Sequence, residues 1–578
     1  MGTVTRIYKN KGTKGKCSNE RGITVSSNFG KLFERIINDR AKKVTNVSDA
    51  QSGGKEQRST TDHLLILKEL IRDQKRKRHP LYLVFLDVTK AFDKAWLDGI
   101  MHAMHNNGLT GPLWNITRKM NLNLKATIKT KHGLTRPISI RDSIRQGGVL
   151  SGLQYALVMD EIAKEITKTN KGCPIPGNPN DKLGCLLWMD DVVLVTNNEL
   201  EIQELLDITH ATAGKYHIEF GQEKSKYMTI GTNKELTLNL GAMKIEKAKV
   251  YKYLGEIIHE KMSLDPNIKA AKSKAEGAYQ TILAIAGDPL LKGIQMETIW
   301  KLVETCITPI ITYGAETWET TKKETKTTNQ ILDNILKRIL KVPNSTPREA
   351  LYIETGIIDI EHTIKKLRIG MLHRLDKTKN VLIDKILQNQ HDKAWSKITK
   401  LIAEEIGIKS DIIPSLSSNS IKKEIKRAVD LNFHSNISKA ANEKSKIKHL
   451  LEGIGSWTPG TRPIYMSKLN RTQTSSIFKA RTRMLPVKNN YRCQYKDNIC
   501  RGCKAETETQ QHVLENCRGI HSNNETKVPA SHYFTEDVQL LTKASENIQL
   551  ICNILAQSDV PVAPTGNIPR PGNRTHTR

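Results

Sequence analysis

The sequence predicts an α+β fold in which strands that end in carboxylates precede a set of helices and a small cysteine-rich unit. Two apolar runs, 81–86 and 186–195, have the length and composition of buried strands, and aspartates end the first and interrupt the second. Apolar residues recur at helical spacing in 331–340. Three cysteines and one histidine gather within 500–517, which is typical of a small metal-stabilised unit.

The two apolar runs place three carboxylates where strands end. Asp87 stands where the chain turns from strand to helix, and Asp190 and Asp191 stand at the bend of a predicted hairpin. Adjacent acids between apolar strands are unfavourable unless cations neutralise them, and three carboxylates that meet can hold two divalent ions for in-line phosphoryl transfer. Hard oxygen ligands favour Mg2+ over zinc. We therefore expect a nucleotide-polymerising site with two magnesium ions, comprising Asp87, Val88, Asp190 and Asp191.

The charge of the chain indicates a polyanionic partner. Lysine and arginine total 90 against 60 acidic residues, a formal net charge of +30, which attracts phosphate backbones over long range. Membrane surfaces are anionic as well, but no apolar run reaches the roughly 18 residues of a spanning helix. The N-terminal segment 1–16 is basic and lacks the apolar core of a secretory signal. We expect an intracellular protein of the nucleus, the cytoplasm or both, with no membrane partner.

Two local basic segments stand out. Residues 75–80, Lys-Arg-Lys-Arg-His-Pro, predict an exposed loop that leads into the first apolar strand, with a nuclear-import signal as the alternative. Residues 478–488 mix basic side chains with aromatic and apolar ones. That composition suits the binding of RNA or single-stranded DNA.

The cysteine-rich unit has the ligand spacing of a structural zinc site. Its ligands would be Cys500, Cys503, His512 and Cys517, with the first pair on a tight turn and the second pair on a following helix. Cys493 is an alternative ligand. A coincidental or redox-active cluster is the competing interpretation of these residues. A closed four-ligand site is the commoner use of such spacing, so we expect one zinc ion here.

Helices are predicted over much of the second half of the chain. In 331–340 isoleucine and leucine line one face, while Lys337, Arg338 and Lys341 lie on the other. Residues 376–475 are rich in lysine and isoleucine and predict further helices of no assignable task. A helix is expected over 536–556, and the proline-containing end, 558–578, is expected to be disordered.

Seven motifs together carry a family resemblance. In chain order they cover 21–27 with Lys31, 51–62, 85–93, 145–151, 188–191, 223–228 and 251–255. Each motif is short, but their order over roughly the first 255 positions is specific, and a weaker likeness reaches about residue 520. The chain resembles a reverse transcriptase of a non-LTR, LINE-like retrotransposon.

The resemblance implies a right-hand polymerase with fingers, a palm built on an antiparallel sheet and a helical thumb, followed by a helical region and a Cys-Cys-His-Cys zinc knuckle. The implied boundaries are fingers in 1–80, palm with part of the fingers in 81–260, thumb in 261–375, helical connector in 376–475, basic segment and knuckle in 476–520, and C-terminal helix and tail in 521–578. The helix at 331–340 would then grip a template–primer duplex through its phosphates.

The resemblance also implies residue roles. Phe92 would lie beneath the incoming sugar and favour deoxynucleotides, and Gln146 and Gly147 would line the nascent base pair. Lys224 would protonate the pyrophosphate leaving group, because an ammonium beside a charged phosphate suits general-acid catalysis.

The resemblance assigns two more residues to the nucleotide, and the sequence differs from the family pattern at two positions. Arg21 and Lys31 would contact the triphosphate of the nucleotide. Met189 stands where most relatives have alanine before the paired acids, and Gly152 stands where most have proline. Neither departure removes a catalytic group.

The implied partners are an RNA template, a DNA primer and deoxynucleoside triphosphates. The chain has no room for the endonuclease that LINE-like proteins carry, so we expect nicking, if needed, to come from elsewhere and the chain to be truncated, a fragment or a domesticated copy. One alternative is a catalytically inactive nucleic-acid-binding protein. Another is an RNA-dependent RNA polymerase or intron maturase, against which Phe92 and the cysteine unit respectively argue.

Overall fold

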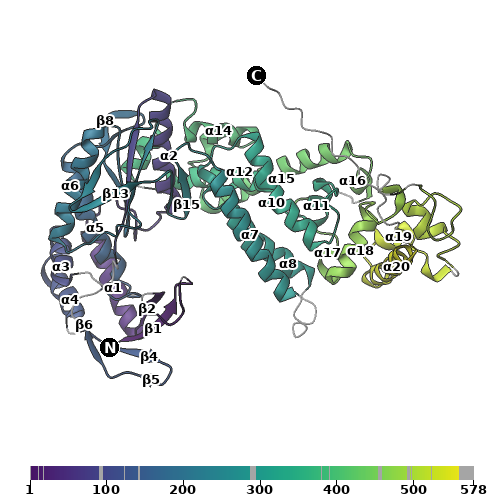
Figure 1. Ribbon diagram of the computed structural model, residues 1–578, viewed down its shortest axis with the longest axis horizontal. Helices are drawn as coiled ribbons and strands as arrows, with labels where there is room; N and C mark the ends of the chain where they lie inside the picture. The colour runs from purple at the N-terminus through teal and green to yellow at the C-terminus, as the bar shows by residue number, and fades with distance from the viewer. Residues whose placement is uncertain are drawn as a thin grey trace. The chain divides into compact units, whose positions relative to one another are not determined.

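The computed structural model shows a mixed helix-and-sheet protein, as the sequence predicts (Figure 1). It describes residues 2–558 apart from 11, 17–18, 90–95, 123, 141–143, 287–294, 379, 390, 454–457, 491–494, 496 and 522–523. Two compact units form: the first comprises Met1–Lys269, Tyr313–Thr321 and Ile364–Ile425, and the second comprises Ala270–Thr312, Lys322–Thr363 and Lys426–Arg578.

A six-stranded sheet forms the centre of the first unit. Its strands, in spatial order, are β12 (Leu238–Leu240), β13 (Met243–Lys247), β11 (Lys226–Ile230), β3 (Leu81–Asp87), β10 (Asp191–Thr196) and β9 (Cys185–Trp188). Strand β3 pairs antiparallel with both β10 and β11, and β10 pairs antiparallel with β9. The first apolar run therefore forms an inner strand, and the second forms its neighbour β10 and the edge strand β9.

Strand β3 is apolar throughout because both faces of the sheet are covered there. Alternate residues from Tyr82 to Leu86 pack in one core with α3 (Leu97–Asn106), α5 (Ser151–Lys168) and α6 (Glu199–Lys215). On the opposite face Phe85 stacks on Tyr251, with ring centroids 4.2 Å apart. Tyr251 belongs to the hairpin of β14 (Val250–Tyr253) and β15 (Glu256–His259). An alternating pattern would have left one covered face polar.

The remaining elements of the first unit surround this sheet. A second sheet joins β1 (Gly2–Tyr8), β2 (Glu20–Val25), β4 (Leu124–Thr130), β5 (Gly133–Leu134) and β6 (Ile138–Ile140), while β7 (Cys173–Ile175) pairs with β8 (Asn178–Leu183). The other helices are α1 (Asn28–Val44), α2 (Thr60–Lys77), α4 (Gly111–Asn121), α13 (Val381–Leu387) and α14 (Trp395–Glu405). Helices α7 (Asp265–Ala286), α12 (Ile360–Asp376) and α15 (Ser418–Asn442) each contribute residues to both units.

The second unit is helical. Its own helices of five or more residues are α8 (Met296–Leu302), α9 (Thr308–Thr312), α10 (Lys322–Ile339), α11 (Arg348–Thr355), α16 (His449–Gly453), α18 (Arg471–Arg481) and α20 (Val538–Gln557). The apolar face predicted in 331–340 is buried along α10, and Arg338 of its basic face pairs with Glu276 of α7 at 2.6 Å. Helix α20 occupies the segment predicted to be helical near the C-terminus.

Two predictions about basic segments are wrong in part. Residues 75–77 are the last turn of α2 and not a loop, because Asp73 pairs with both Arg76 and Lys77 along the helix. In 478–488, Phe478 is fully buried, and Arg481 is only 4% exposed because it pairs with the buried carboxylate of Glu354. These two side chains serve the core and cannot contact nucleic acid.

No helix in the described part of the chain combines the length and apolar character needed to cross a bilayer.

Candidate active site

Three carboxylates meet at one end of the central sheet. Asp191 begins β10 and lies directly opposite Asp87, the last residue of β3. Asp191 also lies opposite Trp188 in the β9–β10 hairpin, so Met189 and Asp190 form the two-residue turn. Met189 has a φ of 57°, in the left-handed region. The tight turn and the strand register bring together acids that are a hundred residues apart in the chain.

Lys224 joins these acids because its loop runs along the end of β3. The backbone N–H of Gly221 donates to the carbonyl of Asp87 at 2.8 Å. From this loop the Lys224 ammonium contacts both carboxylate oxygens of Asp87, at 2.8 and 3.0 Å. The lysine therefore lies at the acids, where the sequence predicts it.

The three acids lie in an environment that disfavours their combined negative charge. Burial raises the pKa of the Asp190 carboxyl, and the charge of Asp87 adds to the rise. Burial, followed by the charges of Asp190 and Asp87, raises the pKa of Asp191 to about 6. The cluster is therefore short of positive charge even with the Lys224 ammonium nearby.

The acids open onto a large cleft within the first unit, with an empty volume of about 2090 Å3 that includes space open to solvent. Of the predicted site residues, the cleft is lined by Arg21, Asp87, Val88, Gln146, Gly147, Asp190 and Lys224. Asp191 and Lys31 do not line it, and Phe92 lies outside the described residues. The structure thus gathers most of the predicted site but not Lys31.

The Gln146–Gly147 segment is held against the small sheet. The N–H of Thr24 on β2 donates to the carbonyl of Gln146 at 2.7 Å. Gly147 has a φ of 104°, and a Cβ there would lie 2.9 Å from the Thr24 carbonyl oxygen, so only glycine fits. On either side of this segment in the chain, Arg145 and Val149 are held by the buried Glu34 of α1. The Glu34 carboxylate pairs with Arg145 at 2.5 Å and accepts a hydrogen bond from the Val149 N–H at 2.8 Å.

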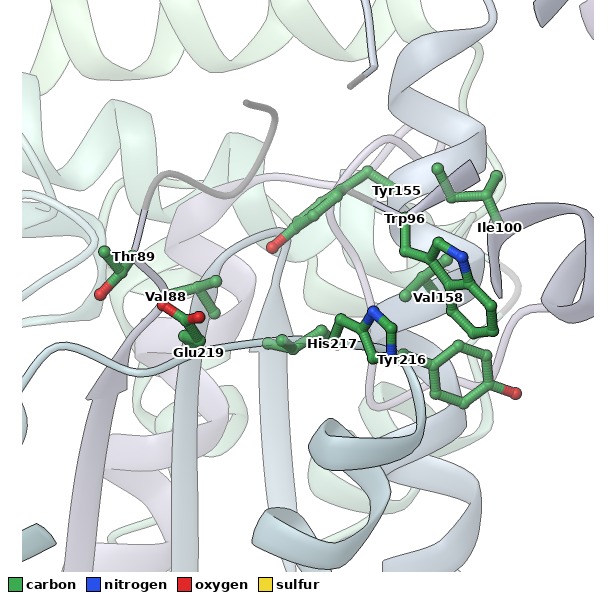
Figure 2. Close-up of a pocket in the computed structure, with 10 residues that line it drawn as sticks. Val88, Thr89, Trp96, Ile100, Tyr155, Val158, Tyr216, His217 and Glu219 are labelled. Atoms are coloured by element: carbon green, nitrogen blue, oxygen red, sulfur yellow. The ribbon is translucent and has the colours of Figure 1, made fainter. Parts of the chain in front are cut away.

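A smaller pocket of about 350 Å3 adjoins the cleft and shares Val88 and Thr89 with it (Figure 2). The Tyr155 ring of α5 crosses its top, with the hydroxyl directed toward Val88 and Thr89. Burial raises the pKa of Tyr155, and the charges of Asp190 and Asp87 add to the rise. Sequence patterns did not single out Tyr155, because its spacing on α5 is that of an ordinary core residue.

A second cluster of candidate ligands lies in the second unit. The ligand atoms of Cys500, Cys503, His512 and Cys517 all lie within 4.8 Å of one another. The Cys500 and Cys517 sulfurs are 3.6 Å apart, and the Cys503 sulfur is 3.3 Å from His512 Nε2. A tetrahedral zinc with sulfur ligands has sulfur–sulfur separations of about 3.8 Å, so the donor set and spacing fit zinc. Cys493 lies outside the described residues.

Neighbouring groups orient the His512 ring and change the pKa values of the cysteine thiols. His512 Nδ1 lies 3.0 Å from the Glu506 carboxylate, which leaves Nε2 facing the thiols. Burial opposes ionisation of Cys503, but the N–H groups of Glu506 and Ala505 outweigh it and lower the pKa of this thiol to about 6. Burial raises the pKa of Cys517 to about 12. A metal ion would be needed to hold all the thiols as thiolates.

A family comparison identifies the domain that contains the first site. Residues 7–258, which contain the acids, the Gln146–Gly147 segment and Lys224, match the model of the family described as reverse transcriptase (RNA-dependent DNA polymerase). These residues are a reverse transcriptase domain. Two curated relatives, described next, come from a retrotransposable element and a transposon.

The curated relatives of the reverse transcriptase are transposon proteins. A Pol polyprotein from the type-1 retrotransposable element R2 of Popillia japonica is 23% identical over 62% of this chain and 50% of its own length. A probable RNA-directed DNA polymerase from transposon BS of Drosophila melanogaster is 20% identical over 67% of this chain and 43% of its own. The chain thus spans about half the length of the curated relatives it matches.

Among solved structures, the chain is similar to a telomerase from Candida tropicalis. The two are 12% identical, the likeness covers 67% of this chain and 69% of that one, and the TM-score is 0.35.

The acid cluster of the reverse transcriptase fits a divalent cation. Its donors are carboxylate oxygens, the ligands that Mg2+ takes in proteins. The raised pKa values of Asp190 and Asp191 indicate that added positive charge would be favourable there. Asp87, Asp190 and Asp191 are the side chains that would hold it, and Val88 lines the cleft beside them.

The raised pKa of Asp191 leads to a stability prediction for this reverse transcriptase. The charged carboxylate is disfavoured in the folded protein, so its destabilising effect is absent below the ordinary pKa of 3.8, grows as pH rises from there to about 6, and is complete above about 6. We expect Asp191→Asn to raise the free energy of unfolding by about 1–2 kcal/mol at pH 8, after discounting for partial exposure, and by much less at pH 4.5.

Urea denaturation in metal-free buffer, followed by tryptophan fluorescence, measures this difference because Trp188 lies beside the turn. Asp207→Asn, on the exposed side of α6, is the control and should change stability little at either pH. An equal gain for Asp191→Asn at both pH values would mean that ionisation is not its cause.

Proposed function

We propose that this chain is an RNA-directed DNA polymerase that extends a primer 3′ end on an RNA template with deoxynucleoside triphosphates. The observation that carries the proposal is the convergence of Asp87, Asp190 and Lys224 in the lining of one cleft, with Asp191 directly opposite Asp87 on the neighbouring strand. The match of residues 7–258 to the reverse transcriptase family supports it.

Each residue then has a task. Asp87, Asp190 and Asp191 hold magnesium, which when bound activates the primer hydroxyl and stabilises the charge that develops on the phosphates. Lys224, already within hydrogen-bond distance of Asp87, is placed to donate a proton to the departing pyrophosphate. Gln146 and Gly147 line the same cleft, where they would contact the nascent base pair.

The charge of the cleft mouth supports the binding of a triphosphate and a phosphate backbone. Arg21, Lys9 and Lys224 line the same cleft as the acids. Cations at this position attract phosphates, and the net charge of +30 extends that attraction to the template and primer. Lys31 does not line the cleft, so its charge would act on the nucleotide only before the nucleotide enters.

We further propose that the second cluster binds one structural zinc and that the predicted parts form a right-hand polymerase. In this proposal residues 1–80 are fingers, 81–260 palm with part of the fingers, 261–375 thumb, 376–475 a helical connector and 476–520 a basic segment with the zinc knuckle. The burial of the α10 apolar face supports the thumb, and the gathering of Cys500, Cys503, His512 and Cys517 supports the knuckle.

Primer extension tests the proposed function. The purified chain should extend oligo(dT) on poly(rA) with dTTP and Mg2+, and should extend poorly when UTP replaces dTTP. Absence of extension by freshly purified protein that still binds the template–primer would refute the polymerase and leave a nucleic-acid-binding protein. Efficient use of UTP would indicate an RNA polymerase instead.

A further inference from the structure

Residues 50–54 run alongside the hairpin that carries the paired acids. The Leu187 N–H of β9 donates to the Ala50 carbonyl at 2.8 Å, and the Ser52 N–H donates to the Leu187 carbonyl at 3.1 Å. Gln51 and Leu187 form a parallel bridge. This segment therefore adds a short strand to the outer edge of β9, next to the turn.

The Gln51 side chain reaches the turn itself. It is fully buried, and its Oε1 accepts hydrogen bonds from the N–H of Gly53 at 2.8 Å and from the N–H of Met189 at 3.2 Å. Met189 is the left-handed residue, with a φ of 57°, that immediately precedes Asp190. A residue with a Cβ is disfavoured in this conformation and keeps it only when its surroundings hold it there.

Two glycines let the segment approach this closely. A Cβ on Gly53 would lie 2.5 Å from the Met189 nitrogen, and a Cβ on Gly54 would lie 2.8 Å from the Met189 Cε. Gly54 also has a φ of 77°. A side chain at either position would push the segment away from Met189 and lengthen the Gln51 hydrogen bond.

The other end of the Gln51 amide has no partner. Its Nε2 is buried and makes no hydrogen bond within the described part of the chain. A buried donor without a partner is costly, so a glutamine here is a poor solution for stability alone. The favourable contribution of this side chain comes from the amide oxygen, which points at the turn backbone.

We propose that Gln51 is a positioning residue for the catalytic turn: by accepting the Met189 N–H it holds Met189 left-handed and so directs Asp190 toward Asp87. The inference rests on the proposed polymerase function, because its consequence is a metal site that is correctly assembled. Gln51 is buried beside the turn and does not line the cleft.

The test is primer extension by Gln51→Met, which keeps the size of the side chain and removes its acceptor. We expect the maximal extension rate to fall about 10- to 100-fold, because displacement of a reacting group by an ångström has effects of this size. The affinity for Mn2+, measured by electron paramagnetic resonance without nucleotide, should weaken about tenfold. Thermal stability and template–primer affinity should change little.

Substitutions at Met189 provide the decisive control. Glycine adopts a left-handed φ without penalty and alanine does not, while both remove the methionine side chain. In the Gln51→Met background, Met189→Gly should therefore recover at least about fivefold of the lost rate, and Met189→Ala should recover none.

Each outcome has a defined meaning. Equal recovery by glycine and alanine, or unchanged rate and Mn2+ affinity in Gln51→Met, would overturn the proposal. A fall in thermal stability that matches the fall in rate, with Mn2+ affinity intact, would make Gln51 merely structural and also overturn it. Failure of the wild-type protein to extend any primer would refute the polymerase function, and the Mn2+ measurement would still decide whether Gln51 positions the acids.

Discussion

Asp190→Asn should abolish primer extension, lowering the rate by at least about a thousandfold, while template–primer affinity stays within about twofold of wild type. Asp190 lies at the tip of the β9–β10 turn and lines the cleft beside Asp87. An amide is nearly the same size as a carboxylate but carries no charge to hold magnesium. Nucleic-acid affinity depends on the basic surface and should not fall when one acid is neutralised.

The comparison needs one matched variant. Asp207→Asn makes the same chemical change on an exposed part of α6 in the same unit, and it should extend primers like the wild type. Extension rates and filter-binding affinities are measured on the same template–primer. Near-normal extension by Asp190→Asn would remove this residue from the metal site, and equal loss in Asp207→Asn would mean that charge in general, and not the turn, is responsible.

Cys503→Ser should remove zinc and unfold the cysteine-rich segment, 500–517, around it. The metal would connect the Cys500 turn to the short π-helical turn at His512–Asn516, and a structural zinc contributes about 10–16 kcal/mol of apparent binding free energy in small metal-dependent units. A serine hydroxyl is a weak ligand for zinc, so most of this contribution is lost. We expect zinc content to fall from about one ion per chain to near zero and RNA binding to weaken, while generic primer extension is spared.

Several measurements separate these effects. Zinc content is determined by plasma mass spectrometry, RNA affinity by filter binding, and generic extension on poly(rA)/oligo(dT). Cys306→Ser, an exposed cysteine in the same unit, is the control and should keep its zinc. A stoichiometry near zero in the wild-type protein would refute the zinc site. Loss of generic extension in Cys503→Ser would mean that the cysteine unit supports catalysis as well.

The acid site shows how far local sequence carries a prediction. The run 81–86 is apolar at every position, and that composition alone predicts a buried strand, which β3 is. The two apolar flanks of Asp190 and Asp191 predict a hairpin with the acids at its bend, and β9 and β10 form it. Both predictions depend on interactions within a few residues, where sequence pattern and structure coincide.

The interpretation of 478–488 as a nucleic-acid-binding segment failed at a side chain whose partner is distant in the chain. Arg481 appears in a basic, aromatic segment, but Glu354 is fully buried and requires a cation, so Arg481 turns inward. No pattern near residue 481 indicates this carboxylate. Gln51 and Glu34 were missed as parts of the site for the same reason, since each acts on a segment more than a hundred residues away. Tyr155 was missed because its spacing on α5 is that of an ordinary core residue.

The sequence by itself determined the chemistry available to this protein: three aspartates at strand ends, a lysine to join them, four soft ligands at zinc spacing, and a strongly positive surface. Only the tertiary structure decided the geometry of the site. The opposition of Asp191 to Asp87, the approach of Lys224, and the support of Met189 by Gln51 all arise from strand pairing and packing between segments far apart in the chain. Composition and spacing report what a side chain can do, whereas its partner depends on how the whole chain buries its apolar surface.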